Sequence, residues 1–279
     1  MEPEAMDRNY SELVVLRTPG RNPPLFCIHD GNFRHMAANL KTDHTVYGLR
    51  PVNLDAKVDF GVERLAASHL QQLFSVQARG PYRLIGYSFG GLVAFEMARL
   101  LAKQGEYVGF LGLVDTLHPS FVTDLSPAEI LKFRKTLLAD RIRKYARNLI
   151  QGKIQSVSAD ASRFLLKKVR PIAWNITKRL YEALNRPLPS RPQALINEQM
   201  WRSYTPKEYP GHLVLFRVQK AMDGGKEFDG DLALGWRKYA KNGVDIQFVQ
   251  GGHGTVMEMP HVLSLVTKLE PYLVDVDPH

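Results

Sequence analysis

Cysteine is almost absent from this chain, since Cys27 is the single one among 279 residues. One cysteine cannot form an internal disulfide, so we interpret Cys27, inside the apolar run 25–28, as a buried core thiol. The sequence also lacks any apolar run of the roughly 18 residues that a membrane-spanning helix needs. Residues 1–7 are acidic and polar, unlike a secretory signal. These absences favour a protein of the reducing cytoplasm that is not stably inserted in a membrane.

Internal repeats and low-complexity segments are absent too, and short apolar runs alternate with helical patterns instead. The runs typical of strands are 13–16, 25–28, 45–49, the run ending at Ile85, 110–114, 213–218 and 244–249. Helical spacing of apolar residues occurs over 33–40, 62–78, the stretch that follows Gly90, 232–239 and 260–273. Unbroken apolar strands that alternate with helices predict an α/β protein, whose mostly parallel sheet is covered by helices on both faces.

The stretch 117–191 interrupts this alternation, because it has helical patterns but no strand pattern. We therefore predict a core in two parts, residues 1–116 and 192–279, separated by a helical insertion, or lid, at 117–191. Residues 119–191 contain 16 Lys and Arg but only 5 Asp and Glu, whereas the whole chain has a net charge of +9. The basic charge is thus concentrated in the lid, and the rest of the chain is slightly acidic.

Basic charge on one segment has several explanations. The simplest is a helix face exposed to solvent, and the main functional alternative is a docking surface for an acidic protein or a phosphate-bearing ligand. Apolar residues at 164–166 and Trp174 beside several basic residues would also suit contact with a membrane surface. Nucleic acid is disfavoured as a partner because the chain contains no recognisable nucleic-acid-binding module.

The stretch 80–91, GPYRLIGYSFGG, contains the pattern Gly86-x-Ser88-x-Gly90 between an apolar run and a long apolar helix. This context is typical of a nucleophile elbow, a strained turn that exposes a serine hydroxyl at the end of a buried strand. Glycine is needed on both sides because a Cβ there would collide with neighbouring backbone. The alternative interpretation is an ordinary turn in which Ser88 caps the helix.

A nucleophilic serine needs a general base, and the base needs an acid that orients it. In α/β-hydrolases these residues follow the order Ser, then Asp or Glu, then His. His253 comes directly after the strand pattern 244–249, so it should emerge on the same rim of the sheet as Ser88, and we predict it to be the base. His29 and His118 also follow strands but do not fit this order.

Two carboxylates compete for the role of the acid. Asp115 ends the strand pattern that follows the elbow helix, and Asp223 follows the strand pattern 213–218, where most α/β-hydrolases keep their acid. Both should lie at the carboxyl edge of the sheet, although Asp223 could also be a simple turn residue. Asp115 is our first choice, and Asp223 stays open as the alternative.

An acyl-transfer site also needs two N–H donors for the oxyanion of the tetrahedral intermediate. The first should be the backbone N–H of Phe89, directly after the nucleophile. The second should come from the loop after the strand pattern 25–28, where we expect Gly31 to be the donor and name Asp30 second.

Several blocks of this chain resemble the thioesterase domains of nonribosomal peptide synthetases and polyketide synthases. The blocks are PLFCIH at 24–29, GPYRLIGYSFGG at 80–91, AFEMA at 94–98, YPGHLVLFR at 209–217, GW at 235–236 and GHGTVMEMPHV at 252–262. The resemblance covers nearly the whole chain apart from the lid and both tails. One departure is Asp30, where family members often have Pro, and this carboxylate could perturb the oxyanion loop or bind a substrate amine.

The resemblance implies an α/β-hydrolase fold and a Ser-His-Asp thioesterase. Its substrate would be an acyl, peptidyl or polyketide chain on the phosphopantetheine arm of a carrier protein, transferred to Ser88 and released by hydrolysis or macrocyclisation. The resemblance also favours Asp115 as the acid, and we expect no metal and no cofactor of the protein's own. The carrier protein is the expected partner and could dock near the basic lid. Alternatives are a general esterase or acyl-CoA thioesterase, and a non-catalytic carrier-docking module.

Overall fold

The computed structural model describes residues 11–18, 20–51, 61–123, 174–177, 179–181, 183, 193–218 and 232–274. Seven strands form one sheet in the order β1-β3-β2-β4-β5-β6-β7. The strands are β1 (Ser11–Arg17), β2 (Asn22–Ile28), β3 (His44–Pro51), β4 (Tyr82–Tyr87), β5 (Val108–Val114), β6 (Leu213–Val218) and β7 (Val244–Val249). Only β1 runs antiparallel to its neighbour, and the other pairs are parallel, which confirms the predicted mostly parallel sheet.

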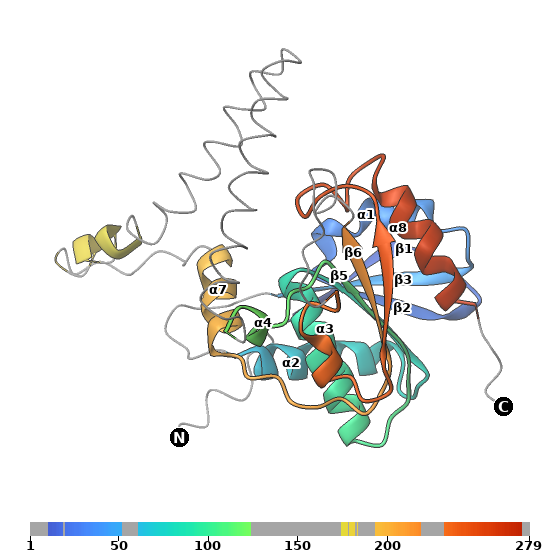
Figure 1. The fold of residues 1–279 in the computed structure, drawn as a ribbon, viewed down its shortest axis with the longest axis horizontal. Coiled ribbons are helices and arrows are strands. Elements are labelled where there is room, and N and C mark those ends of the chain that lie inside the picture. The colour runs from blue at the N-terminus through green and yellow to red at the C-terminus, as the bar shows by residue number, and fades with distance from the viewer. Residues whose placement is uncertain are drawn as a thin grey trace, which may run out of the picture. The chain divides into compact units, whose positions relative to one another are not determined.

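Helices α1 (Arg34–Asn39), α2 (Val62–Val76), α3 (Phe89–Lys103) and α8 (Val262–Leu269) cover the two faces of this sheet (Figure 1). The described residues also form helices α4 (Ser120–Thr123) and α7 (Gln193–Ser203) and the short 3₁₀ helices η2 (Asp30–Asn32), η4 (Trp236–Lys238) and η5 (Glu270–Tyr272). The apolar side chains of α1 and α8 share a core cluster with one face of the strands, and α2 and α3 pack together against the other. The central strands are buried on both faces, as all six residues of β6 show, which explains why these strands are mostly apolar.

The helix expected over 232–239 is wrong, because the structure has only the 3₁₀ turn η4 there. Leu234 and Gly235 both have left-handed backbone conformations, with φ of 52° and 88°, which stop a right-handed helix from forming. A Cβ on Gly235 would lie only 2.9 Å from the Cβ of His118, so this turn is pressed closely against the segment after β5. The apolar residues here serve to bury Trp236, whose side chain is fully inaccessible.

The chain divides into two compact units, one of residues 1–54, 59–121 and 200–279, and the other of residues 55–58 and 122–199. Most of the predicted lid, including 124–173, lies outside the described residues, so its boundaries at 117 and 191 stay a prediction. No helix in the part of the chain that the structure describes is both long and apolar enough to cross a bilayer.

A buried carboxylate ties helix α3 to the segment after α7. Glu96 is almost completely inaccessible, and its carboxylate accepts bonds from Nε and Nη2 of Arg99 at 2.8 and 2.6 Å. The hydroxyl of Tyr204 donates to the same group at 2.8 Å. Burial, and then the charge of Glu96, raise the pKa of Tyr204, so this hydroxyl remains a donor. The shared bonds compensate the cost of burying the charge and fix the helix that follows Ser88.

A second buried polar residue, His69 on α2, should make the stability of the protein depend on pH. Its Nδ1 lies 2.5 Å from Oγ of Ser11, and burial, with a smaller effect of His29, lowers its pKa well below 6.5. Below about pH 6.5, His69 therefore binds a proton in the unfolded chain but stays neutral in the folded protein until the pH is much lower. We expect the free energy of unfolding to fall with decreasing pH in that range, by up to about 1.4 kcal/mol per pH unit from this group.

Urea denaturation across this pH range measures that slope. His69→Gln should flatten it, because glutamine does not titrate, while the exposed His35→Gln on α1 should keep it. An unchanged slope in the His69 variant would show that other groups cause the dependence.

Candidate active site

Ser88 lies in the sharp turn between β4 and α3, with φ of 53° and ψ of −120°. This backbone conformation is strained for a residue with a side chain. A Cβ on Gly86 would collide with the carbonyl oxygen of Gly90, and a Cβ on Gly90 would lie 2.6 Å from the carbonyl oxygen of Ile28. The predicted need for glycine on both sides is therefore confirmed. The side chain of Ser88 makes no capping bond to α3, so the alternative of a simple helix cap does not hold.

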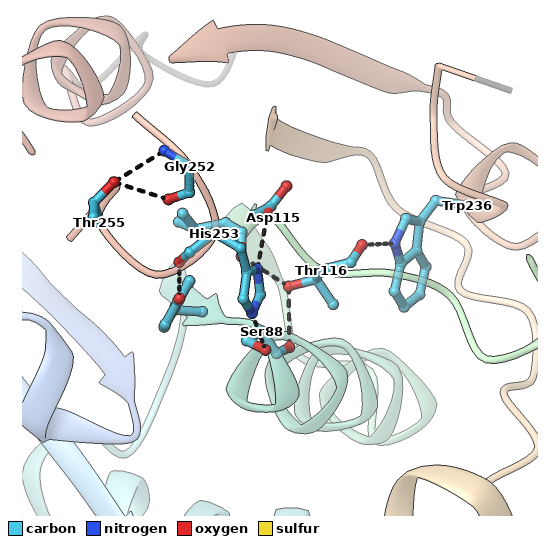
Figure 2. Close-up of polar contacts among 9 residues, drawn as sticks. Ser88, Asp115, Thr116, Trp236, Gly252, His253 and Thr255 are labelled. Atoms are coloured by element: carbon cyan, nitrogen blue, oxygen red, sulfur yellow. Dashed lines mark hydrogen bonds and ion pairs between the residues drawn. The ribbon is translucent and has the colours of Figure 1, made fainter. Parts of the chain in front are cut away.

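His253 lies in the loop after β7, between Ser88 and Asp115 (Figure 2). Its Nε2 is 3.1 Å from Oγ of Ser88, and its Nδ1 is 2.6 Å from Oδ2 of Asp115. A carboxylate only accepts, so Nδ1 carries the proton and Nε2 presents a lone pair to the serine hydroxyl. The side chain of His253 is 55% exposed and that of Asp115 is 14% exposed, so the base is open to solvent and the carboxylate is more enclosed.

Asp115 stands at the carboxyl end of β5, and its backbone also has a positive φ, of 44°. Its N–H donates to the carbonyl of Phe216 on the adjacent strand β6 at 2.8 Å, which holds the turn against the sheet. The structure thus brings three of the predicted residues together, namely Ser88, His253 and Asp115. Asp223, the alternative acid, lies outside the described residues.

Hydrogen bonds inside the loop hold the histidine in place. The N–H of Gly252 donates to Oγ1 of Thr255 at 3.0 Å, and the N–H groups of Thr255 and Val256 donate to the carbonyl of Gly252 at 2.9 Å. Figure 2 shows the closed turn that results, with the side chain of His253 directed toward Ser88.

Tyr87, the residue before the serine, also supports this loop. Its hydroxyl donates to the carbonyl of His253, and its ring lies 5.2 Å from the imidazole ring. Burial, and then the negative charges of Asp115 and Glu258, raise the pKa of Tyr87 to about 12, so it stays protonated and able to donate. Sequence reasoning missed this residue, although its position between Gly86 and Ser88 was the available signal.

The two predicted oxyanion donors come from segments that meet at the elbow. Phe89 is the first residue of α3, so its N–H has no place in the intrahelical ladder. Gly31 lies in η2, which follows β2 after the single residue His29, and a Cβ there would meet nothing within 4 Å. The ring of His29, which precedes η2, lies 5.5 Å from that of Phe89, so the loop after β2 adjoins the start of α3. The choice between Gly31 and Asp30 as second donor stays a prediction.

The imidazole of His118 is fully buried and packs 3.9 Å from the ring of Tyr239, which is a position in the core rather than at the site. Among the described residues, no group of three or more His, Cys, Asp and Glu is arranged to hold a metal ion.

Comparison with known proteins identifies the family. Residues 23–270 match the model of the thioesterase domain. The chain belongs to the thioesterase domain family. It is 27% identical to malpinin synthetase of Mortierella alpina over 94% of this chain but only 3% of the synthetase. It is 35% identical to a dimodular nonribosomal peptide synthase of Bacillus subtilis, over 39% of this chain and 5% of that protein.

Solved structures agree on the fold. The NocB thioesterase domain from the nocardicin cluster superposes with a TM-score of 0.60 at 19% identity, covering 95% of this chain and 99% of that one. The four-domain nonribosomal peptide synthetase AB3403 gives a TM-score of 0.62 at 20% identity, with 95% of this chain and 20% of that chain covered. This thioesterase domain therefore has the α/β-hydrolase fold that the sequence predicts. The chain spans only 3% and 5% of the length of the two synthetases named above. The substrates and partners of those synthetases can therefore only be proposed for this chain.

Proposed function

We propose that this thioesterase domain releases an acyl, peptidyl or polyketide chain from the phosphopantetheine arm of a carrier protein. The release proceeds through an ester on Ser88. The observation that carries this proposal is the position of His253, which lies within hydrogen-bond distance of both the Ser88 hydroxyl and the Asp115 carboxylate. A strained turn holds the serine at the end of a buried strand, which is the environment in which an activated nucleophile is expected.

In the first half of the reaction, Oγ of Ser88 attacks the thioester carbonyl while Nε2 of His253 takes its proton. The electron pair of the carbonyl moves to oxygen, and the N–H groups of Phe89 and of Gly31 or Asp30 bind the resulting oxyanion. The intermediate then collapses, the carbon–sulfur bond breaks, and His253 returns the proton to the departing thiolate. The products of this half are a Ser88 ester and a carrier with a free thiol.

In the second half, water or a nucleophile within the bound chain attacks the Ser88 ester. His253 removes a proton from the attacking group and delivers it to Oγ of Ser88, which restores the enzyme. Asp115 stabilises the imidazolium in both halves and keeps the proton on Nδ1. Water gives hydrolysis, and an internal hydroxyl or amine gives a macrocycle.

The three side chains supply nucleophile, base and orienting acid, so the proposed reaction needs no cofactor of the protein's own. The phosphopantetheine arrives with the substrate. Membership of the thioesterase domain family and similarity to synthetases support a carrier protein as the partner. The basic residues within 119–191 support docking of an acidic carrier near that segment.

Mass spectrometry of the protein after mixing with an acylated carrier tests the proposal. We expect the acyl mass on the peptide that contains Ser88, followed by free acid or macrocycle in solution. Raising the ionic strength from about 0.1 M to about 1 M shortens the Debye length from about 10 Å to about 3 Å. The KM for the carrier should therefore rise, and the KM for the same acyl group on pantetheine should change much less.

If no acylated carrier gave either an adduct on Ser88 or a released product, the proposal would be contradicted. Equal turnover of carrier-bound and free thioesters, without salt dependence, would support a general thioesterase instead.

A further inference from the structure

Thr116 lies directly behind the elbow and is almost completely buried. Its Oγ1 is 3.2 Å from the carbonyl oxygen of Ser88 and 3.2 Å from that of Val114, and these two acceptors share its single proton. On the other side, Nε1 of Trp236 donates to the carbonyl of Thr116 at 2.8 Å. Figure 2 shows this chain of contacts, which runs from Trp236 through Thr116 to the backbone of Ser88.

The bond to Ser88 matters because of the peptide group that it holds. The carbonyl of Ser88 and the N–H of Phe89 belong to one planar trans peptide unit, so they point in opposite directions. The Thr116 hydroxyl and the N–H of Gly91 both donate to this carbonyl, so together they hold the direction of the carbonyl and, with it, that of the Phe89 N–H. That N–H is the donor assigned above to the oxyanion.

The surroundings allow Thr116 little freedom. A Cβ on Gly91 would collide with its side chain, so glycine on α3 lets the two segments approach closely. The indole of Trp236 is fully buried and packs against the rings of Phe95 and His118, with centroids 4.7 and 4.8 Å away. The position of Thr116 is therefore set by the core and not by solvent.

We propose that Thr116, held by Trp236, is a positioning residue that aims the Phe89 N–H at the oxyanion. This inference rests on the proposed function. It also gives a physical reason for the Gly235-Trp236 pair, because the left-handed turn at Gly235 delivers the indole to the carbonyl of Thr116.

Thr116→Val separates this role from a role in stability. Valine keeps the branched shape and replaces the hydroxyl with a methyl group. The carbonyls of Ser88 and Val114, which lose the hydroxyl donor in this variant, each keep a backbone donor. The N–H of Gly91 donates to the carbonyl of Ser88 and the N–H of Ser88 donates to that of Val114, each at 3.0 Å. No buried acceptor is left without a donor, so urea denaturation should give nearly the wild-type midpoint.

The experiment measures the rate at which a fluorophosphonate labels Ser88 as a function of the fluorophosphonate concentration. Oγ displaces fluoride at phosphorus, and the phosphoryl oxygen occupies the oxyanion position, so no knowledge of the natural substrate is needed. Losing a whole oxyanion donor costs about 10²- to 10³-fold, and a misdirected one should cost less, so we expect Thr116→Val to lower the maximal labelling rate about tenfold. The half-saturating concentration should stay unchanged.

Thr116→Ser restores the hydroxyl and should recover most of the rate. Thr267→Val makes the same chemical change on α8, where the hydroxyl donates to the carbonyl of Leu263 at 2.9 Å, and should label like wild type. If Thr116→Val does not unfold cooperatively, Trp236→Phe tests the same relay by removing the Nε1 donor, and a lowered maximal rate is expected.

A wild-type rate in Thr116→Val, or equal loss in the Val and Ser variants, would overturn the inference, as would a wild-type rate in Trp236→Phe. These outcomes leave the proposed function standing as long as the wild-type protein labels at Ser88. If the wild-type protein does not label, the proposed function fails and this inference fails with it.

Discussion

Replacing Ser88 with alanine is expected to lower kcat for chain release by about 10⁶-fold, because removing the nucleophile of a serine hydrolase costs about as much as removing the whole triad. The remaining activity would come from direct attack of water with help from the oxyanion donors. Alanine retains the Cβ and the positive φ of the turn, so the variant should unfold at nearly the wild-type urea concentration.

Steady-state release from an acylated carrier gives kcat, and mass spectrometry should show no acyl adduct on the variant. Ser75→Ala is the matched control, since Ser75 is an exposed residue of α2 whose hydroxyl donates to a local carbonyl, that of Gln72. Turnover above about one percent of wild type, or an adduct on another residue, would show that Ser88 is not the nucleophile.

The elbow could be predicted because its requirements are local. Gly86 and Gly90 flank the serine at positions where any Cβ meets backbone, and that constraint is readable in the sequence as a spacing. The sheet was predictable for a similar reason, since the central strands contain apolar runs of about the right length, such as 25–28 and 110–114.

Features set by tertiary contacts could not be predicted in this way. Leu234 and Gly235 adopt left-handed conformations because Trp236 must reach the core, and helical spacing of apolar residues cannot signal this. The supporting bonds of Tyr87 and Thr116 join segments far apart in the chain, so no local sequence pattern reveals which groups these side chains bond.

The acid was ambiguous for a geometric reason. β5 and β6 are adjacent parallel strands, so residues that follow either strand reach the same edge of the sheet. Asp115 and Asp223 both satisfy that criterion, and strand order alone does not tell which carboxylate meets the imidazole. The structure adds one distance, 2.6 Å between Oδ2 of Asp115 and Nδ1 of His253.

Asp115→Asn should therefore lower kcat by about 10⁴-fold, the cost of presenting the wrong imidazole tautomer to the nucleophile. The amide can place an N–H donor against Nδ1, which then carries no proton, and the proton moves to Nε2, where it blocks acceptance from Ser88. Asparagine tolerates the positive φ of this turn, so the backbone should be preserved and urea denaturation should show a folded variant.

Asp223→Asn is the matched comparison, because it makes the same change at the other candidate acid. Its kcat should remain close to that of wild type if Asp115 orients His253. The reverse order of the two effects would assign the acid to Asp223, and comparable losses would mean that both carboxylates act on the imidazole. Fluorophosphonate labelling rates should rank the two variants in the same order, since the tautomer of His253 governs activation of Ser88 whatever the acyl group is.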